Sequence, residues 1–507
     1  MIENWILGLT QLLHWQVPLA IAIGVGMGIA VGAMPGLSGP TGIALMIPFT
    51  YMLSPIVSIA LLVSLYSAAE YGGSITAITI NTPGTPSAAI TAIDGYPLTQ
   101  QGKTGQALTL SIVSSAIGGF FGTVILILFS IPLARAAIAF GPVQYFSLGV
   151  FGLSVIASLS GGNWLKAVIA ALIGLLIKTI GSDPLSGTFR FTLDWPTLWD
   201  GVPFVPAMLG LFAITEVFNI IEAGVKTRLA KGAEFSSEWI PWSQIKALWK
   251  CILRSACIGT IVGVIPGAGA VIASILSYNE AKRFSKNPDA FGQGSFEGVC
   301  ASETANNACV GGAMVPLLTL GVPGSGSTAV LIGAMMLHNI APGPLLFSKH
   351  PDIVYGIFIC LFVANIFMLL LGLLGIRFWL KVVQISPAIL GPLIFGVAFI
   401  GAYSIGGSLG DIVIMIVIGL IGYVMRKFKF PLVPLVIALV LGEMVEISLH
   451  RALILSGGNF VIFIKDPISL GLLLAALFST GFAIVRDFRS EKKRGKTELP
   501  SSIRRGV

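Results

Sequence analysis

Apolar runs long enough to cross a bilayer recur along the chain from Val17 to Val485, and many of them are interrupted by glycine or proline. A hydrocarbon core about 30 Å thick takes roughly 20 helical residues, and it tolerates no unpaired backbone. Only 10% of the residues are charged and 55% are hydrophobic, whereas soluble domains carry about 25% charged residues. The sequence therefore predicts an all-α polytopic integral membrane protein. Its longest polar stretches, near 225–250 and 486–507, are too short for a separate soluble domain.

The sequence contains an internal repeat, because four pairs of segments match in the same order in its two halves. The pairs are GAMPGLSG (32–39) with GVIPGAGA (263–270), GGSITAITINTPGTPSAA (72–89) with GAMVPLLTLGVPGSGSTA (312–329), FGLSVIASLSGG (151–162) with FGVAFIGAYSIGG (395–407) and, more weakly, VPFVPAMLGLFAITE (202–216) with FPLVPLVIALVLGE (430–443). Chance explains one such pair more easily than four in order. We therefore expect a first membrane repeat at 1–224, a connecting loop at 225–254, a second membrane repeat at 255–485 and a basic tail at 486–507.

The distribution of basic residues predicts how these repeats are oriented. Loop 225–254 holds six Lys/Arg and two acids, and tail 486–507 holds eight Lys/Arg and three acids. The positive-inside rule makes both cytoplasmic, whereas loop 182–202, with three aspartates and one arginine, is expected outside. Five crossings before the connecting loop put the N-terminus on the periplasmic side, so the two halves have inverted topology, as in many secondary transporters.

Two further features of the termini bear on targeting and partners. Residues 1–15 lack the positive region of a cleaved signal peptide, so we expect the first hydrophobic segment to be retained. The tail supplies five of the eight net positive charges, and basic residues at helix ends indicate orientation rather than a nucleic-acid ligand.

Four glycine- and proline-rich interruptions, two in each half, fall within the apolar sequence. They are Pro35-Gly36-Leu37-Ser38-Gly39 (break 1), Asn81-Thr82-Pro83-Gly84-Thr85-Pro86-Ser87 (break 2), Pro266-Gly267-Ala268-Gly269 (break 3) and Gly321-Val322-Pro323-Gly324-Ser325-Gly326-Ser327-Thr328 (break 4). Proline removes a backbone donor, and glycine adopts angles that other residues resist. The backbone groups freed in this way need protein, water or a ligand as partners. Half-helix N-termini favour an anion, and exposed carbonyls favour a cation.

The breaks therefore supply the candidate substrate-binding residues, which we expect to meet near the bilayer midplane. These are Pro35, Gly36, Ser38, Gly39, Asn81, Pro83, Gly84, Thr85, Ser87, Pro266, Gly267, Gly269, Pro323, Gly324, Ser325, Ser327 and Thr328. A single Pro-Gly in a membrane helix is better explained by close packing. Four breaks that the repeat pairs, rich in Ser, Thr and Asn, favour a binding site.

Polar residues in apolar context next to the breaks are candidates for a coupling ion. They are Glu303, Thr304, Asn306 and Asn307 in the second half and Glu70 in the first. Such an oxygen-rich set suits Na+ or proton uptake, and a Na+ site would draw on Asn306, Asn307, Thr85 and Thr328. An equally good interpretation is a glutamate that bonds to the backbone and only positions helices. Glu216, Glu443 and Glu446 lie near helix ends, which favours structural or interfacial roles.

Several of these motifs carry a family resemblance. GAMPGLSGPTGIALMIPFT, YGGSITAITINTPGTPSAAITAIDGYPL, GVIPGAGAVIASILSYNEAKRFSK and EGVCASETANNACVGGAMVPLLTLGVPGSGSTAVLIGAMMLHNIAPGPLLF resemble the large membrane subunit of the tripartite tricarboxylate transporter family. The resemblance is dense over 20–110 and 255–350. It implies a secondary transporter of the bacterial inner membrane that imports a tricarboxylate, dicarboxylate or aromatic acid with Na+ or H+. It also implies two partners, a periplasmic solute-binding protein and a small four-helix membrane subunit.

Two other functions stay open at this point. One is a stand-alone ion-coupled carrier that needs no partner subunits. The other is an intramembrane enzyme that uses Glu303 and Glu70 as acid and base, although the sequence has no evident nucleophile–base pairing or metal-ligand spacing. The sequence also lacks the phosphate-binding motif G-x-x-x-x-G-K-[ST], so ATP hydrolysis is not expected. We therefore expect that the protein is not an enzyme and that it uses no cofactor beyond the coupling ion.

Overall fold

The computed structural model describes residues 2–34, 36–159, 164–223, 238–382 and 385–497. Within these ranges the chain is almost entirely helical, and nine helices are long and apolar enough to cross a membrane. They are Gln16–Ala33, Pro55–Ile80, Thr104–Ala137, Phe204–Glu222, Pro351–Leu374, Ala388–Gly406, Leu409–Lys427, Leu432–Leu455 and Pro467–Val485. The prediction of an all-α polytopic membrane protein is confirmed.

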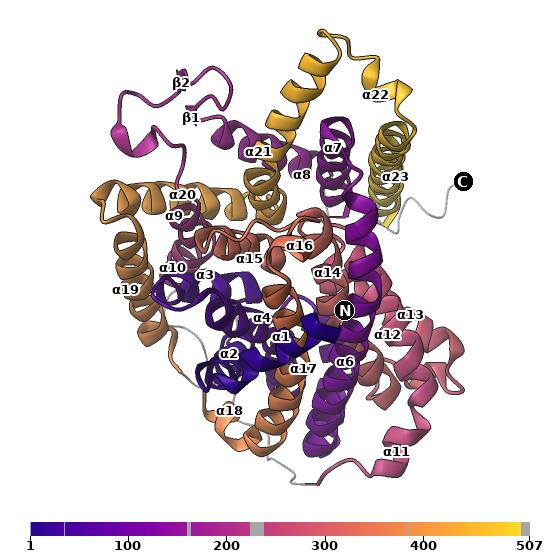
Figure 1. The fold of residues 1–507 in the computed structure, drawn as a ribbon. Coiled ribbons are helices and arrows are strands. Elements are labelled where there is room, and N and C mark those ends of the chain that lie inside the picture. Colours follow the sequence, from indigo (N-terminus) through magenta and orange to yellow (C-terminus); the bar gives the residue numbers. More distant parts are fainter. Residues whose placement is uncertain (1, 35, 160–163, 224–237, 383–384, 498–507) are drawn as a thin grey trace. The chain divides into compact units, whose positions relative to one another are not determined.

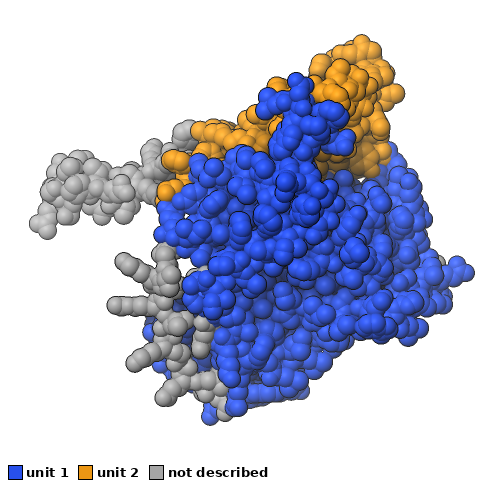
Figure 2. All heavy atoms as spheres, turned by 90° about the vertical axis from the view of Figure 1, so that its left-hand side faces the viewer, with its two compact units in different colours: residues 1–139, 192–424 blue, residues 140–191, 425–507 orange. Residues whose placement is uncertain are grey.

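The chain packs into two compact units, coloured separately in Figure 2. Unit 1 comprises Met1–Ala139 and Thr192–Val424, and unit 2 comprises Phe140–Phe191 and Met425–Val507. Each unit thus contains parts of both predicted repeats, 1–224 and 255–485. Compact packing in this protein therefore does not follow the division of the sequence into halves.

Unit 1 begins with six helices (Figure 1). They are α1 (Ile2–Leu13), α2 (Gln16–Ala33), α3 (Gly39–Thr50), α4 (Pro55–Ile80), α5 (Ala88–Gln100) and α6 (Thr104–Ala137). The other elements of unit 1 come after residue 192. They are η1 (Pro196–Leu198), α9 (Phe204–Met208), the π-helical turn η2 (Leu209–Ile214), α10 (Thr215–Ala223), α11 (Trp242–Ala247), α12 (Trp249–Val264), α13 (Gly269–Phe284), η3 (Pro288–Ala290), α14 (Phe296–Leu320), α15 (Gly326–Leu337), α16 (Leu346–Lys349), α17 (Pro351–Leu374), α18 (Ile376–Val382), α19 (Pro387–Gly406) and α20 (Leu409–Lys427), whose last residues lie past the unit boundary.

One order of elements occurs twice in unit 1. A helix, a break and a second helix are followed by a long helix, another break, a short helix and a further long helix. The first series is α2, α3, α4, α5 and α6, and the second is α12, α13, α14, α15 and α17 with the one-turn α16 before its last member. This order matches the first two pairs of similar segments in the sequence.

Small residues allow the long helices of both series to pack closely. Gly24, Gly28 and Gly32 are four residues apart on α2, and each faces a backbone carbonyl of α4 so closely that a β-carbon would lie 2.2–2.5 Å from it. On α12, Gly259 and Gly263 face carbonyls of α14 at similar separations, 2.3 and 2.5 Å. Spacing of this kind is typical of helix pairs in membranes. It leaves α14 packed against α12 and α6, and α2 packed against α4.

Unit 2 contains four longer helices and a short hairpin. Its elements are α7 (Pro142–Leu159), α8 (Trp164–Lys178), β1 (Gly181–Ser182), β2 (Phe189–Arg190), α21 (Leu432–Leu455), α22 (Ile462–Lys465) and α23 (Pro467–Thr497). The two strands pair antiparallel, with Gly181 opposite Arg190. Helix α23 extends into the predicted basic tail, and residues 498–507 lie outside the described ranges.

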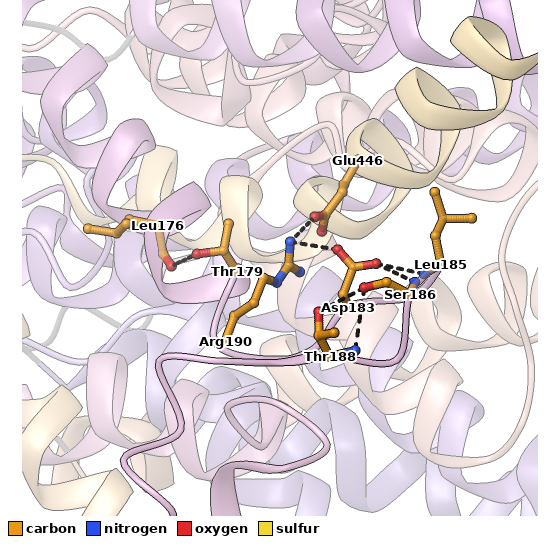
Figure 3. Close-up of polar contacts among 8 residues, drawn as sticks. All are labelled: Leu176, Thr179, Asp183, Leu185, Ser186, Thr188, Arg190 and Glu446. Atoms are coloured by element: carbon orange, nitrogen blue, oxygen red, sulfur yellow. Dashed lines mark hydrogen bonds and ion pairs between the residues drawn. The ribbon is translucent and has the colours of Figure 1, made fainter.

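The β1–β2 hairpin is fastened to α21 by an ion network (Figure 3). Arg190 Nη1 lies 2.6 Å from Glu446 Oε1 and 3.2 Å from Asp183 Oδ2. Asp183 Oδ1 also accepts bonds from the backbone N–H groups of Leu185 and Ser186, at 2.9 and 2.8 Å. Arg190 on β2 therefore pairs with both the residue that follows β1 and a glutamate of α21. Glu446, expected to be structural, is in this network.

Candidate functional site

The structure interrupts its helices at all four predicted breaks. Break 1 separates α2 from α3, break 2 separates α4 from α5, break 3 separates α12 from α13, and break 4 separates α14 from α15. Asn81 and Gly321 end α4 and α14 in the left-handed conformation, with φ of 55° and 70°. Pro35 of break 1 lies outside the described residues. All four breaks belong to unit 1.

Breaks 1, 3 and 4 come together at the start of α15. The backbone N–H of Gly267 in break 3 donates to the carbonyl of Gly324 in break 4 at 2.9 Å. A β-carbon on Gly39, at the end of break 1, would lie 2.8 Å from Ser327 Oγ of break 4. Break 4 is thus the common neighbour of breaks 1 and 3.

Break 2 folds back onto α4 and the end of α2. The Gly84 N–H donates to the Gly73 carbonyl of α4 at 3.1 Å. A β-carbon on Gly84 would lie 1.9 Å from the carbonyl oxygen of Gly32, in the last turn of α2 and shortly before break 1. The four segments, which are spread over residues 35–328 of the sequence, are therefore linked in one region of unit 1.

Break 4 is held in shape by its own hydroxyl groups. Ser325 Oγ accepts from the Thr328 N–H at 3.2 Å, and Thr328 Oγ1 accepts from the Ser325 N–H at 2.7 Å. This capping box satisfies two backbone donors that the break would otherwise leave unpaired. The hydroxyl of Tyr66 on α4 lies 3.1 Å from Ser325 Oγ, and Ser325 is half-buried. Thr328 is fully buried, whereas Ser325 keeps part of its surface exposed.

Break 2 carries a line of hydrogen bonds to the first candidate carboxylate. Thr85 Oγ1 lies 3.1 Å from Ser87 Oγ, and Ser87 donates to Glu70 Oε2 at 2.7 Å. Both hydroxyl residues are buried, while Glu70 is half-buried. The structure thus joins Glu70 directly to the break, which its separate place in the sequence did not require.

Glu303 is the more deeply buried carboxylate, with no solvent exposure. Its Oε2 accepts from Ser115 and Ser111 of α6 at 3.0 and 3.2 Å. Its Oε1 accepts from Thr91 of α5 and, at 3.3 Å, from Asn306 Nδ2. Four uncharged donors therefore surround the carboxylate, and among the described residues neither Glu303 nor Glu70 forms an ion pair.

The remaining candidates for a coupling ion lie around Glu303 on α14. Thr304, Asn306 and Asn307 are all fully buried. Asn307 Nδ2 donates to the Glu303 backbone carbonyl and to Asn306 Oδ1, while Asn307 Oδ1 has no hydrogen-bond partner among the described residues. Among the described residues, no hydrogen bond joins Thr85 or Thr328 to Asn306 or Asn307. A Na+ site built from these four residues stays a prediction.

The structure places Glu216, for which the sequence favoured a structural or interfacial role, beside break 1. Glu216 is 6% exposed and lies in the first turn of α10, the helix after the π-helical turn η2. A β-carbon on Gly36 of break 1 would lie 2.3 Å from Glu216 Oε1. The weak pairing of its segment with 430–443 was a signal, but its place near a helix end favoured a structural interpretation. The hydroxyls on Glu303 gave no signal, because Ser and Thr are common in membrane helices.

Comparison with known proteins identifies the family. The model of the tripartite tricarboxylate transporter TctA family matches residues 19–437, which include all four breaks and both carboxylates. The chain belongs to this family. The match confirms the resemblance read from the sequence motifs.

Two curated relatives of this TctA-family protein come from Agrobacterium vitis. An "uncharacterized 52.8 kDa protein in TAR-I ttuC' 3'region" is 37% identical over 478 residues, which cover 93% of this chain and 94% of that protein. An "uncharacterized protein in TAR-II ttuC' 3'region" is 38% identical over 234 residues, covering 46% of this chain and 97% of that protein. No solved structure matches.

Proposed function

We propose that this TctA-family chain carries a carboxylate inward across the bacterial inner membrane by symport with Na+ or H+. A periplasmic solute-binding protein delivers the substrate, which is a tricarboxylate, dicarboxylate or aromatic acid, and a small four-helix membrane subunit completes the complex. The observation that supports this function best is the meeting of breaks 1, 3 and 4 at the start of α15.

The chemistry of that region suits an anionic substrate. Helices α3, α5, α13 and α15 each begin at a break and have 12 to 16 residues. The first N–H groups of a helix lack partners within it, and the helix dipole adds positive potential there. Several helix N-termini in one region favour a carboxylate without the cost of placing a lysine or arginine in the membrane.

The two glutamates provide a reason for coupling to a cation. Glu70 adjoins break 2, and Glu303 is bound by Thr91 on the helix that follows that break. An ionised carboxylate beside the site repels an anionic substrate, and the repulsion is strong where the dielectric constant is low. A proton or Na+ that neutralises this charge therefore promotes substrate binding. Under this proposal, substrate and cation travel together.

The topology that goes with this function is the one expected from charge. Repeats 1–224 and 255–485 are inserted in opposite directions, the N-terminus is periplasmic, and 225–254 and 486–507 are cytoplasmic. Reporter fusions after residues 200 and 240 check this arrangement, because the two positions should report opposite sides of the membrane.

The function is tested by uptake in the native host, deleted for the gene and complemented with it. Inwardly directed gradients of Na+ or of H+ are imposed on membrane vesicles, with and without added binding protein. The uptake of labelled citrate, succinate and benzoate is then measured. We expect accumulation that needs one of the gradients and the binding protein. Accumulation without the binding protein favours a stand-alone carrier, conversion without accumulation favours an enzyme, and accumulation with neither gradient contradicts symport.

A further inference from the structure

Another buried carboxylate, that of Asp94 on α5, lies outside the candidate site and has no solvent exposure. Its Oδ1 accepts from three backbone N–H groups in the loop before α14, those of Gly292, Gly294 and Ser295, at 2.7, 3.0 and 2.8 Å. Its Oδ2 accepts from the hydroxyl of Tyr278 on α13 at 2.8 Å. Hydrogen bonds to an ionised group are stronger than neutral ones. This contact is therefore a firm attachment between α5 and the α13–α14 segment.

The loop is shaped to receive that carboxylate. Gly292 and Gly294 have φ of 88° and 106°, which favours glycine, and this backbone conformation lets the N–H groups of Gly292, Gly294 and Ser295 point to one oxygen. A β-carbon on Gly298, in the first turn of α14, would lie 2.1 Å from Asp94 Oδ2. Gln101, the residue after α5, also donates to the Gln293 carbonyl at 2.7 Å. Loop and helix start are thus both fitted to α5.

Asp94 shares a face of α5 with the residues that hold the two site carboxylates. Ser87, Thr91 and Asp94 are spaced i, i+4 and i+7, which places them along one side of a helix. Ser87 donates to Glu70 at 2.7 Å. Thr91 bonds to Glu303 and lies 2.9 Å from Ser302 Oγ. One polar face therefore contacts Glu70, Glu303 and the loop before α14 in turn.

We propose that Asp94 is a positioning residue that fixes the rotation and height of α5, so that Thr91 stays on Glu303 and Ser87 on Glu70. A helix turns by about 100° and rises 1.5 Å per residue. A slip of α5 by one residue therefore moves both hydroxyls away from their carboxylates. The opposing view is that Asp94 only fastens one end of α5, with no effect on the other contacts. The effect on transport rests on the proposed function, whereas the effect on helix position does not.

The first experiment measures the position of α5 by thiol labelling of the purified full chain. Cys257 is the exposed one of the five free cysteines, so the background is C257S. The reporter is A88C, because Ala88 is fully buried on α5, and the second reporter is A402C, because Ala402 is fully buried on α19. The test variant is D94N, and D289N, at an exposed aspartate in η3, is its matched control.

We expect the cysteine of A88C to be labelled at least tenfold faster when D94N is also present. The labelling rate of A402C should stay the same in D94N, and D289N should change neither rate. Y278F removes one of the four donors, so it should accelerate A88C labelling by a smaller factor. An unchanged A88C rate in D94N overturns the proposal. Equal acceleration of A88C and A402C also overturns it, because it indicates general loosening instead of a shift of α5.

The second experiment uses vesicle uptake of whichever of labelled citrate, succinate and benzoate the wild type accumulates. The Na+ concentration and the pH that give half-maximal uptake are measured for D94N, T91V, D289N and the double variant D94N/T91V. In D94N and in T91V we expect the half-maximal concentration of the coupling ion, Na+ or H+, to change at least threefold. We expect no change in D289N and no further change in the double variant. A merely structural role lowers the maximal rate without a shift, and that result contradicts positioning. Failure of the proposed function is distinguishable, because the wild type then accumulates nothing while thiol labelling still decides the role of Asp94.

Discussion

Replacement of Gly84 by alanine is the sharpest test that the breaks form the transport site. The β-carbon of the new residue would lie 1.9 Å from the Gly32 carbonyl oxygen and 3.0 Å from the Gly73 α-carbon. Ordinary contact begins at 3.4 Å, so break 2 or α2 must move by about 1.5 Å. Gly84 does not have a left-handed φ, so the lack of space alone causes the effect.

The magnitude follows from this displacement. Overpacking of a close contact costs about 1–3 kcal/mol, and the Gly84–Gly73 hydrogen bond contributes about 1 kcal/mol more if it breaks. A protein stable by about 5–15 kcal/mol still folds after such a loss. A shift of about 1 Å at a reacting or binding site can reduce a rate about 100-fold. We therefore expect normal amounts of G84A in the membrane and about 100-fold slower uptake.

The assay compares vesicle uptake and thermal unfolding of G84A with those of G396A. Gly396 lies on α19, and a β-carbon there meets nothing within 4 Å, so G396A should behave as the wild type. G324A is the counterpart in the second half, with a milder clash of 2.8 Å to the Ala313 α-carbon, and should lose less activity. Uptake by G84A within threefold of the wild type would refute the reasoning and leave the breaks as packing features.

Three other expectations concern single charged groups. E303Q keeps a polar group among the four donors and should shift the Na+ or pH dependence of uptake, and an unaltered dependence returns Glu303 to a structural role. E303L leaves those donors unpaired and should lower the free energy of unfolding, measured by thermal unfolding, by at least about 3 kcal/mol. R190Q removes both ion pairs of the hairpin and should speed its proteolysis severalfold, with R190K between it and the wild type; equal cleavage rates would count against the network. Hydrogen bonds from the backbone N–H groups of Ser186 and, to a smaller extent, Leu185 lower the pKa of Asp183. The contribution of Asp183 to hairpin stability is therefore complete above the usual pKa of about 3.9, and it is lost as the pH falls through the lowered pKa. Hairpin proteolysis should therefore rise only at acid pH, and D183N should abolish that rise.

The breaks were predictable because their cause is local. Proline and glycine disrupt a helix wherever they occur, and the pairing of Pro83-Gly84 with Pro323-Gly324 distinguished these positions from ordinary glycines. The helix ends at Ile80 and Leu320 and the restarts at Ala88 and Gly326 follow from that chemistry.

What the sequence could not supply is which distant side chains meet. Ser111 and Ser115 reach Glu303 because α6 packs on α14, and that contact depends on glycines such as Gly118 at the interface. Asp94 lies in a quoted family motif, yet nothing local indicates that a loop almost 200 residues later surrounds it. The pairing of 140–191 with 425–507 in unit 2 is equally non-local.

The two carboxylate attachments described above differ in how ionic strength acts on them. Dissolved ions screen charges over about 8 Å at 0.15 M and over about 3 Å at 1 M, and they act mainly on groups that water reaches. The side chains of Arg190, Asp183 and Glu446 are partly exposed, whereas Asp94 is completely enclosed. Washing membranes with concentrated salt should therefore release the hairpin from α21 and leave α5 attached to its loop. The buffer used for extraction thus determines which of the two attachments survives into a purified sample.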